Sequence, residues 1–201
     1  MEKPGNDNPE EDRATEPASA IVGIEWLAGR MSGSPVQESA KRLADLDGIF
    51  QDAAAYRRMD QQQEIYRVRW WPAAAAGEEG GLIWGVTILQ PGKVGGEYFM
   101  THGHFHANRT RAEYYTVVQG AGLLMRMDEQ RTTWGEAMAP GTLHYIQGRH
   151  AHRVVNVGEE PLIFWACWGS DAGYDYATIR ERGFGARVIE QDGRPKLVSY
   201  E

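Results

Sequence analysis

Three histidines and one glutamate have the residue types and spacing of a metal site. His104 and His106 are two residues apart, so on an extended strand both side chains project from the same face. Glu113 follows after a polar loop, and a strand that returns from this loop would bring its carboxylate to the two imidazoles. His152 is the best candidate for a fourth ligand. Three imidazoles and one carboxylate suit Fe²⁺, Mn²⁺, Zn²⁺ or Ni²⁺ better than Ca²⁺ or Mg²⁺.

The remaining histidines carry a weaker signal. All six histidines lie between positions 102 and 152 of a chain of 201 residues. For His102, His144 and His150 we expect ordinary exposed or hydrogen-bonded side chains.

Glu113 has two candidate roles, because a carboxylate at such a site can hold the ion and can also carry a proton between atoms of a substrate.

Short strands must position these residues. Apolar or alternating runs, separated by turn residues, occur at 21–26, 65–70, 82–89, 97–106, 113–119, 122–127, 131–138, 142–147, 151–157 and 162–168, with a terminal pair at 187–190 and 196–198. Many short strands at this spacing indicate an all-β sandwich or barrel rather than a sheet of alternating strands and helices.

Two short helices are expected beside the strands. The first would begin at Ser34, because a cap residue and Pro35 precede apolar residues at helical spacing. These apolar residues are Leu43, Leu46 and Phe50. The second would be capped by Ser170 or Asp171 and would end at Gly183.

The composition is that of a globular, acidic protein. Apolar residues make up 42% of the chain, and 21 Lys+Arg against 28 Asp+Glu give a net charge of −7. This charge argues against nucleic acid or an anionic membrane as the main partner. Residues 1–18 are acidic, contain little to bury and are expected to be disordered, whereas residues 19–201 are expected to form one domain.

The cysteine content and the absence of long apolar segments narrow the class further. The one cysteine, Cys167, lies in an apolar run and is expected to be an inert core thiol. No stretch has the length and apolarity of a membrane helix, and no apolar signal segment follows the first residues. We therefore expect a cytoplasmic protein.

Two longer motifs carry a resemblance to a known family. Residues 103–106 with 113–122 resemble the first cupin motif, and residues 140–156 resemble the second. Thr101 before Gly-His-Phe-His, together with Asp-Ala-Gly-Tyr-Asp-Tyr at 171–176, is similar to the cupin-type, metal-dependent phosphoglucose isomerases first associated with archaea. The resemblance runs from residue 35 to residue 193. It implies an all-β cupin double-stranded β-helix (jelly-roll) barrel with short flanking helices.

The resemblance also implies a ligand set and an ion. The metal ligands would be His104, His106, Glu113 and His152, which is the set already chosen from residue types and spacing. They would hold one divalent ion per subunit, with Fe²⁺ expected and Mn²⁺, Ni²⁺ or Zn²⁺ as alternatives. A homodimer is expected by analogy with the family.

Further residues are implied on the substrate side of the site. The resemblance assigns the substrate phosphate to Thr87, Thr101 and Gly103, and the sugar pocket to Tyr115, Trp168, Tyr174 and Tyr176. Trp168 stands where the family pattern has tyrosine, and Tyr174 stands where it has histidine. Tyr174 can form a hydrogen bond but, unlike histidine, does not readily gain and lose a proton near neutral pH.

The activity that the resemblance implies is the interconversion of glucose 6-phosphate and fructose 6-phosphate, a step of glycolysis and gluconeogenesis. Glu113 would move a proton between C1 and C2 through an enediol, and a hydride shift would use the same ligands. Three alternatives stay open: an isomerase of another sugar phosphate such as mannose 6-phosphate, an Fe²⁺-dependent cupin dioxygenase, and a sugar-binding cupin without catalysis.

Overall fold

The computed structural model describes residues 22–200, so the predicted tail at 1–18 lies outside the described residues. This part of the chain contains four antiparallel sheets and three short helical segments. The strands are β1 Gly23–Glu25, β2 Arg30–Ser32, β3 Gln37–Arg42, β4 Glu64–Trp71, β5 Leu82–Leu89, β6 Lys93–Val94, β7 Glu97–Tyr98, β8 Glu113–Gln119, β9 Gly122–Met127, β10 Thr133–Met138, β11 Leu143–Ile146, β12 Ala151–Asn156, β13 Leu162–Gly169, β14 Ala186–Gln191 and β15 Arg194–Ser199. The helical segments are the 3₁₀ helix η1 Leu43–Leu46, α1 Ala53–Arg58 and α2 Ala177–Arg182.

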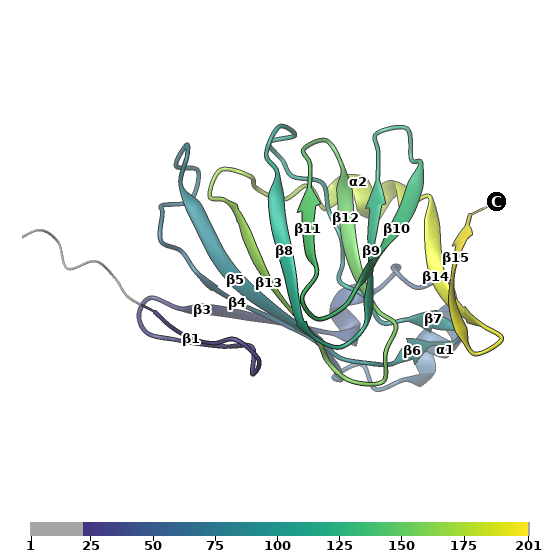
Figure 1. Cartoon of the computed structure of the whole chain (residues 1–201). Coiled ribbons are helices and arrows are strands. Elements are labelled where there is room, and N and C mark those ends of the chain that lie inside the picture. Colours follow the sequence, from purple (N-terminus) through teal and green to yellow (C-terminus); the bar gives the residue numbers. More distant parts are fainter. Residues whose placement is uncertain (1–21, 201) are drawn as a thin grey trace, which may run out of the picture.

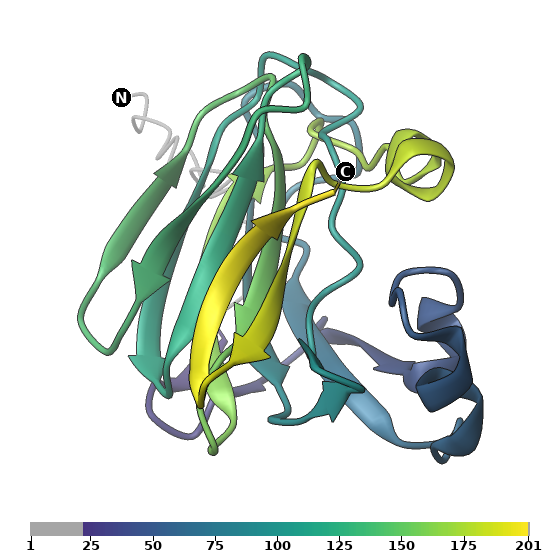
Figure 2. The ribbon, with the colours of Figure 1, turned by 90° about the vertical axis from the view of Figure 1, so that its right-hand side faces the viewer.

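Two sheets form the walls of the barrel (Figure 1). One has the strand order β11-β8-β13-β5-β4-β3, and the other has the order β10-β9-β12. The fourth sheet, β15-β14-β7-β6, extends the smaller wall, and its yellow pair β14–β15 lies beside the green strands in Figure 2. The prediction of a mainly β, double-stranded β-helix barrel with short flanking helices is confirmed.

Strand β8 shows how the sequence produces a two-sided wall. Glu113, Tyr115 and Val117 are buried, whereas Tyr114 is exposed. Side chains alternate along a strand, so the first three share the inner face and the exposed tyrosine lies on the outer face. The ligand candidate Glu113 therefore projects into the barrel.

The outer face of the large sheet has a separate small core under the β1–β2 hairpin. Trp165, Val86, Ile163 and Met31 are buried there. The Trp165 indole donates a hydrogen bond to the carbonyl oxygen of Trp26, 3.1 Å away. Cys167 lies on the same strand as Trp165 but is only partly buried, so it is not the fully buried core thiol that the sequence predicts. Burial still raises the pKa of this thiol, which keeps it protonated at neutral pH.

The first predicted helix is wrong. Residues 37–42 form β3, which pairs with β4 along its whole length. Glu38 forms ion pairs with Arg67 and Arg69 on β4, and this pairing with a distant strand outweighs the local helical spacing. The apolar residues of that pattern are buried as expected, but from η1 and the turn after it; they are Leu43, Leu46 and Phe50.

The second predicted helix exists but begins later. Its cap is neither Ser170, whose hydroxyl donates to the Glu78 carbonyl oxygen, nor Asp171, which pairs with Arg111. The N-cap residue is Tyr176, which makes no side-chain cap bond; Asp175, just before it, accepts hydrogen bonds from the backbone N–H and the hydroxyl of Thr178. The helix ends at Gly183 as predicted. Within the described residues, no helix combines the length and apolarity that a membrane crossing needs.

Candidate metal centre and adjoining pocket

The four predicted ligands come together inside the barrel. Each offers one ligand atom, and these atoms lie within 4.8 Å of one another. Only Glu113, on β8, and His152, on β12, lie in named strands; His104 and His106 lie in the segment that enters the barrel after β7. The predicted strand at 97–106 is therefore shorter than expected, because only Glu97–Tyr98 belong to a sheet.

Backbone pairing fixes the two histidines that lie outside a sheet. His104 and His152 form an isolated antiparallel bridge in which each backbone N–H donates to the other residue's carbonyl oxygen, at 3.2 and 3.0 Å. The Nδ1 of His106 donates to the Arg111 carbonyl oxygen at 2.9 Å, so its Nε2 carries the free lone pair. Arg111 is itself anchored to Asp171.

The donor atoms lack other partners, which is the observation that fits an ion. The Nε2 atoms of His104 and His152 and the Oε1 atom of Glu113 are buried and form no hydrogen bond. The Oε1 atom lies 2.5 Å from His152 Nε2 and 3.6 Å from His106 Nε2. Buried polar atoms without partners are costly, and a divalent ion bound among them would satisfy all of them.

The charge states also suit a metal. Burial, reinforced by His152, lowers the pKa of His104 well below its ordinary value, so this imidazole is neutral. Burial alone would raise the pKa of Glu113, but the neighbouring His152 and His106 imidazoles outweigh it and lower this pKa. An ionised carboxylate beside a neutral imidazole is the state in which such groups bind metals.

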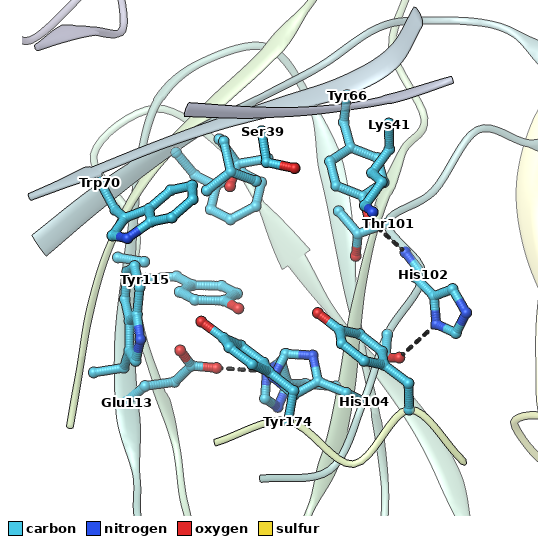
Figure 3. A pocket seen from close by; sticks show the side chains of 18 residues that line it. Ser39, Lys41, Tyr66, Trp70, Thr101, His102, His104, Glu113, Tyr115 and Tyr174 are labelled. Atoms are coloured by element: carbon cyan, nitrogen blue, oxygen red, sulfur yellow. Dashed lines mark hydrogen bonds and ion pairs between the residues drawn. The ribbon is translucent and has the colours of Figure 1, made fainter. Parts of the chain in front are cut away.

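A cavity of about 290 Å³ opens onto this cluster. His104, Glu113 and His152 line it. The structure also places all seven predicted substrate residues on its walls, namely Thr87, Thr101, Gly103, Tyr115, Trp168, Tyr174 and Tyr176. In Figure 3, Glu113 and His104 lie on one side of the cavity, and Lys41, Tyr66 and Thr101 lie together on another.

The second of these regions, which we call the donor end, consists of Lys41, Tyr66, Thr101 and Gly103. The Thr101 hydroxyl oxygen accepts a hydrogen bond from the Val154 N–H at 3.1 Å, so its own proton is free to be donated. The Tyr66 hydroxyl oxygen accepts a long bond, 3.4 Å, from the His102 N–H and has the same freedom. The Lys41 ammonium can only donate. This end of the cavity is therefore suited to an anion.

Three aromatic residues, Trp168, Tyr174 and Tyr176, form a further wall of the cavity, which we call the aromatic wall. Tyr174 and Tyr176 stack with ring centroids 5.6 Å apart, and Tyr174 lies edge-on to His104 at 4.9 Å. Burial raises the pKa of Tyr174 to about 12, so its hydroxyl remains a donor at neutral pH. Trp168 packs so closely on Gly85 that a Cβ there would lie 2.8 Å from the indole.

Sequence reasoning missed several lining residues. Ser39 and Lys41 fall within the predicted first helix, although in the structure they alternate on β3 and both face the cavity. Tyr66 falls within the predicted strand at 65–70, where apolar residues alternate with arginines. This alternation is the signal by which its inward-facing side chain could have been predicted. His102 also lines the cavity, and its Nδ1 contacts the Gly103 carbonyl oxygen at 3.0 Å.

The other two histidines lie outside the cavity, as expected. His144 is buried and its Nε2 lies 2.9 Å from the Thr142 hydroxyl. His150 contacts the Arg126 guanidinium at 3.3 Å. Neither belongs to the ligand cluster.

Comparison with known proteins supplies a family. The profile of the family described as Glucose-6-phosphate isomerase (GPI) matches residues 40–199. The chain is 40% identical over 180 residues to the glucose-6-phosphate isomerase of Pyrococcus furiosus, a match that covers 88% of this chain and 93% of that protein. It is 44% identical over 179 residues to the glucose-6-phosphate isomerase of Thermococcus kodakarensis, covering 88% of this chain and 92% of that protein.

Solved structures give a much weaker similarity. Oxalate decarboxylase from Bacillus subtilis aligns with a TM-score of 0.42 at 18% identity, over 55% of this chain and 26% of that chain. The match to the profile spans most of the chain, and the similarity to the two isomerases extends over nearly their full lengths. The chain therefore belongs to the glucose-6-phosphate isomerase family.

Proposed function

We propose that this chain is a metal-dependent aldose–ketose isomerase that interconverts glucose 6-phosphate and fructose 6-phosphate. The observation that carries the proposal is that a metal-ligand cluster and an anion-binding donor end line one cavity. An open-chain sugar phosphate has matching chemistry, with a carbonyl and a hydroxyl at one end and a phosphate at the other. The names of the relatives agree with this assignment.

Glu113 is the group proposed to move the proton. Its lowered pKa keeps the carboxylate ionised at neutral pH, so it can accept a proton from one of C1 and C2 and return it to the other. Tyr115 lies on the same face of β8, and burial raises its pKa well above the ordinary value. Its hydroxyl is therefore a permanent donor for a substrate oxygen. A hydride shift between the same carbons would leave Glu113 as a ligand only.

The ion proposed for the cluster is Fe²⁺, one per chain, with Mn²⁺, Ni²⁺ and Zn²⁺ as alternatives, held by His104, His106, Glu113 and His152. When bound, it supplies a Lewis acid that polarises the carbonyl of the open-chain sugar. The other positions of the cavity belong to the substrate. Thr87, Thr101, Gly103 and Lys41 are proposed to bind the phosphate, and Tyr115, Trp168, Tyr174 and Tyr176 to line the sugar.

One observation supports a second candidate substrate, mannose 6-phosphate. Trp168 and Tyr174, the two departures from the family pattern, both line the cavity on the sugar side. Epimers at C2 differ only in the groups near the reacting carbons, so this wall can change the preference between glucose 6-phosphate and mannose 6-phosphate. The ligand set also occurs in dioxygenases, but the donor end, whose groups are suited to an anion, favours the isomerase.

The test is a coupled assay with fructose 6-phosphate. Purified protein is incubated with Fe²⁺, Mn²⁺, Ni²⁺ or Zn²⁺, and glucose 6-phosphate is detected by NADP reduction. We expect metal-dependent formation of glucose 6-phosphate, with mannose 6-phosphate measured in parallel. Absence of isomerisation with all four ions, or consumption of O₂ in place of isomerisation, would refute the proposal. Incorporation of solvent hydrogen at C1 or C2 would identify proton transfer, and its complete absence would count against that route.

The cellular setting is proposed on the same basis. The activity would serve glycolysis and gluconeogenesis in the cytoplasm, as part of a homodimer. The outer face of the large sheet supports the dimer, because Tyr114, Leu143 and Tyr145 are 49%, 67% and 50% exposed and lie on the neighbouring strands β8 and β11. Light scattering would detect the dimer, and Tyr145→Glu is expected to shift it to monomer.

A further inference from the structure

Arg153 is a buried cation directly behind the active cavity. It follows the ligand His152 on β12 and therefore projects to the opposite face of that strand. Only 3% of the residue is exposed. Its guanidinium lies over the Phe184 ring, 4.5 Å from the centroid, and does not line the cavity.

The guanidinium holds one carbonyl group. Its Nε and Nη2 atoms donate to the His102 carbonyl oxygen at 3.2 and 2.6 Å. This carbonyl belongs to the peptide that joins His102 to Gly103, and both of these residues line the cavity. Two donors from one planar guanidinium fix the direction of the carbonyl more strictly than a single donor would.

The direction of the carbonyl sets the direction of the N–H. In a planar trans peptide the C=O and the N–H point to opposite sides. Because the His102 oxygen points back to Arg153, the Gly103 N–H points away from it. Within residues 22–200, no acceptor for this N–H is present. The peptide therefore presents an unused donor beside Thr101, at the donor end.

Glycine makes this clamp necessary. Gly103 has a φ of 76°, and a Cβ at this position would lie 2.8 Å from Phe184 and 3.0 Å from Arg153. Only glycine fits here, but a glycine peptide is also free to rotate. Without the guanidinium, little would keep its N–H aimed at an anion. The positive charge at the oxygen end also polarises the peptide and strengthens its donor end.

We infer that Arg153 is a positioning residue, which orients and polarises the His102–Gly103 peptide so that its N–H binds the substrate phosphate. The inference rests on the proposed function for the identity of the substrate. The ligand chemistry itself is broader, because any phosphate dianion at the donor end would use the same N–H. Inorganic phosphate is therefore a direct probe that needs no turnover.

The test compares Arg153→Met with Arg153→Lys. We expect Arg153→Met to raise KM for fructose 6-phosphate and the inhibition constant of inorganic phosphate about tenfold or more. It should leave kcat within about threefold, because the residue does not reach the reacting carbons. Lysine keeps the charge and one donor, so Arg153→Lys should recover part of the loss. Inhibition by a five-carbon sugar acid without phosphate should not change.

Arg187→Met is the matched control. Arg187 is also a partly buried guanidinium over an aromatic ring, 5.3 Å from the centroid of Tyr200, and like Arg153 it does not line the cavity. It differs in that the two hydrogen bonds to the His102 carbonyl oxygen come from Arg153. We expect the loss of Arg187 to leave phosphate inhibition unchanged. Equal weakening of phosphate and of the unphosphorylated acid, or equal effects in both methionine variants, would reduce Arg153 to a structural residue and overturn the inference.

Two outcomes separate the inference from the proposed function. If Arg153→Met does not fold, Arg153→Lys carries the comparison, and unchanged KM and phosphate inhibition in that variant would refute the inference. If the wild-type protein isomerises no sugar phosphate, the proposed function fails, but calorimetric titration with inorganic phosphate still tests the peptide. Absence of phosphate binding to the wild-type protein in that titration would overturn the inference too.

Discussion

Among residues 22–200, Lys41 is the one lysine or arginine that lines the cavity, and replacing it by methionine removes this charge. Methionine keeps most of the length and the apolar stem, so the change removes charge more than shape. A hydrogen bond between an ammonium and a phosphate dianion is charge-assisted, and such bonds contribute about 1.5–3 kcal/mol. Lys41 is only partly buried, and the lower part of that range applies because solvent screens the charge. We therefore expect KM for fructose 6-phosphate to rise about 10- to 50-fold.

The assay is the coupled measurement of initial rates over a range of fructose 6-phosphate concentrations. The value of kcat should stay within about threefold, because Lys41 faces the donor end and not the ligand cluster. Arg42→Met is the control, since it removes the same charge from the next residue of β3, where the guanidinium contacts Gln62. An unchanged KM in Lys41→Met, or an equal rise in both variants, would refute the reasoning about the donor end.

Three further predictions follow from the cluster and its supports. Removal of the ion with a chelator should lower the melting temperature by about 5–10 °C when the free ion concentration beforehand is about 100 times its Kd. Calorimetry measures this shift, and the melting temperature of His152→Ala should not respond to the chelator. Glu113→Gln should lower kcat by about 10²–10⁴-fold in protein with measured metal content, and a loss that only tracks missing metal would exclude the base role. Asp175→Ala should lower the free energy of unfolding by about 1 kcal/mol at pH 7 in urea titrations, because alanine removes the acceptor of both Thr178 hydrogen bonds. Because the hydrogen bonds from Thr178 lower the pKa of the Asp175 carboxyl, this stabilisation is present above the ordinary carboxyl pKa and is lost as the pH falls through the depressed one. The difference in unfolding free energy between the wild-type protein and the variant should therefore shrink in acid.

The ligand cluster could be predicted because its signal is local in type and spacing. His104 and His106 are two residues apart, and Glu113 begins a strand whose alternation faces it inward. Placing His152 at the site requires knowing which distant strand pairs with the segment that contains His104. The bridge between His104 and His152 shows that the answer depends on pairing between segments far apart in the chain, which spacing does not encode.

The donor end could not be predicted for the same reason. Thr101 and Gly103 came from the family resemblance, and Lys41 was hidden inside a pattern that indicates a helix. Its place on the cavity wall depends on β3 pairing with β4, where Lys41 lies opposite Tyr66. Arg153 is harder still, because its role depends on the direction of one carbonyl oxygen rather than on any residue pattern.

A metal titration of the isomerase tests the central claim most directly. Metal-depleted protein is titrated with Fe²⁺ under anaerobic conditions while the conversion of fructose 6-phosphate to glucose 6-phosphate is followed. The account predicts that activity rises in proportion to added ion and reaches a plateau at one ion per chain, and that His152→Ala shows no such rise. Full activity in the metal-depleted protein, or a plateau that His152→Ala reproduces, would contradict it.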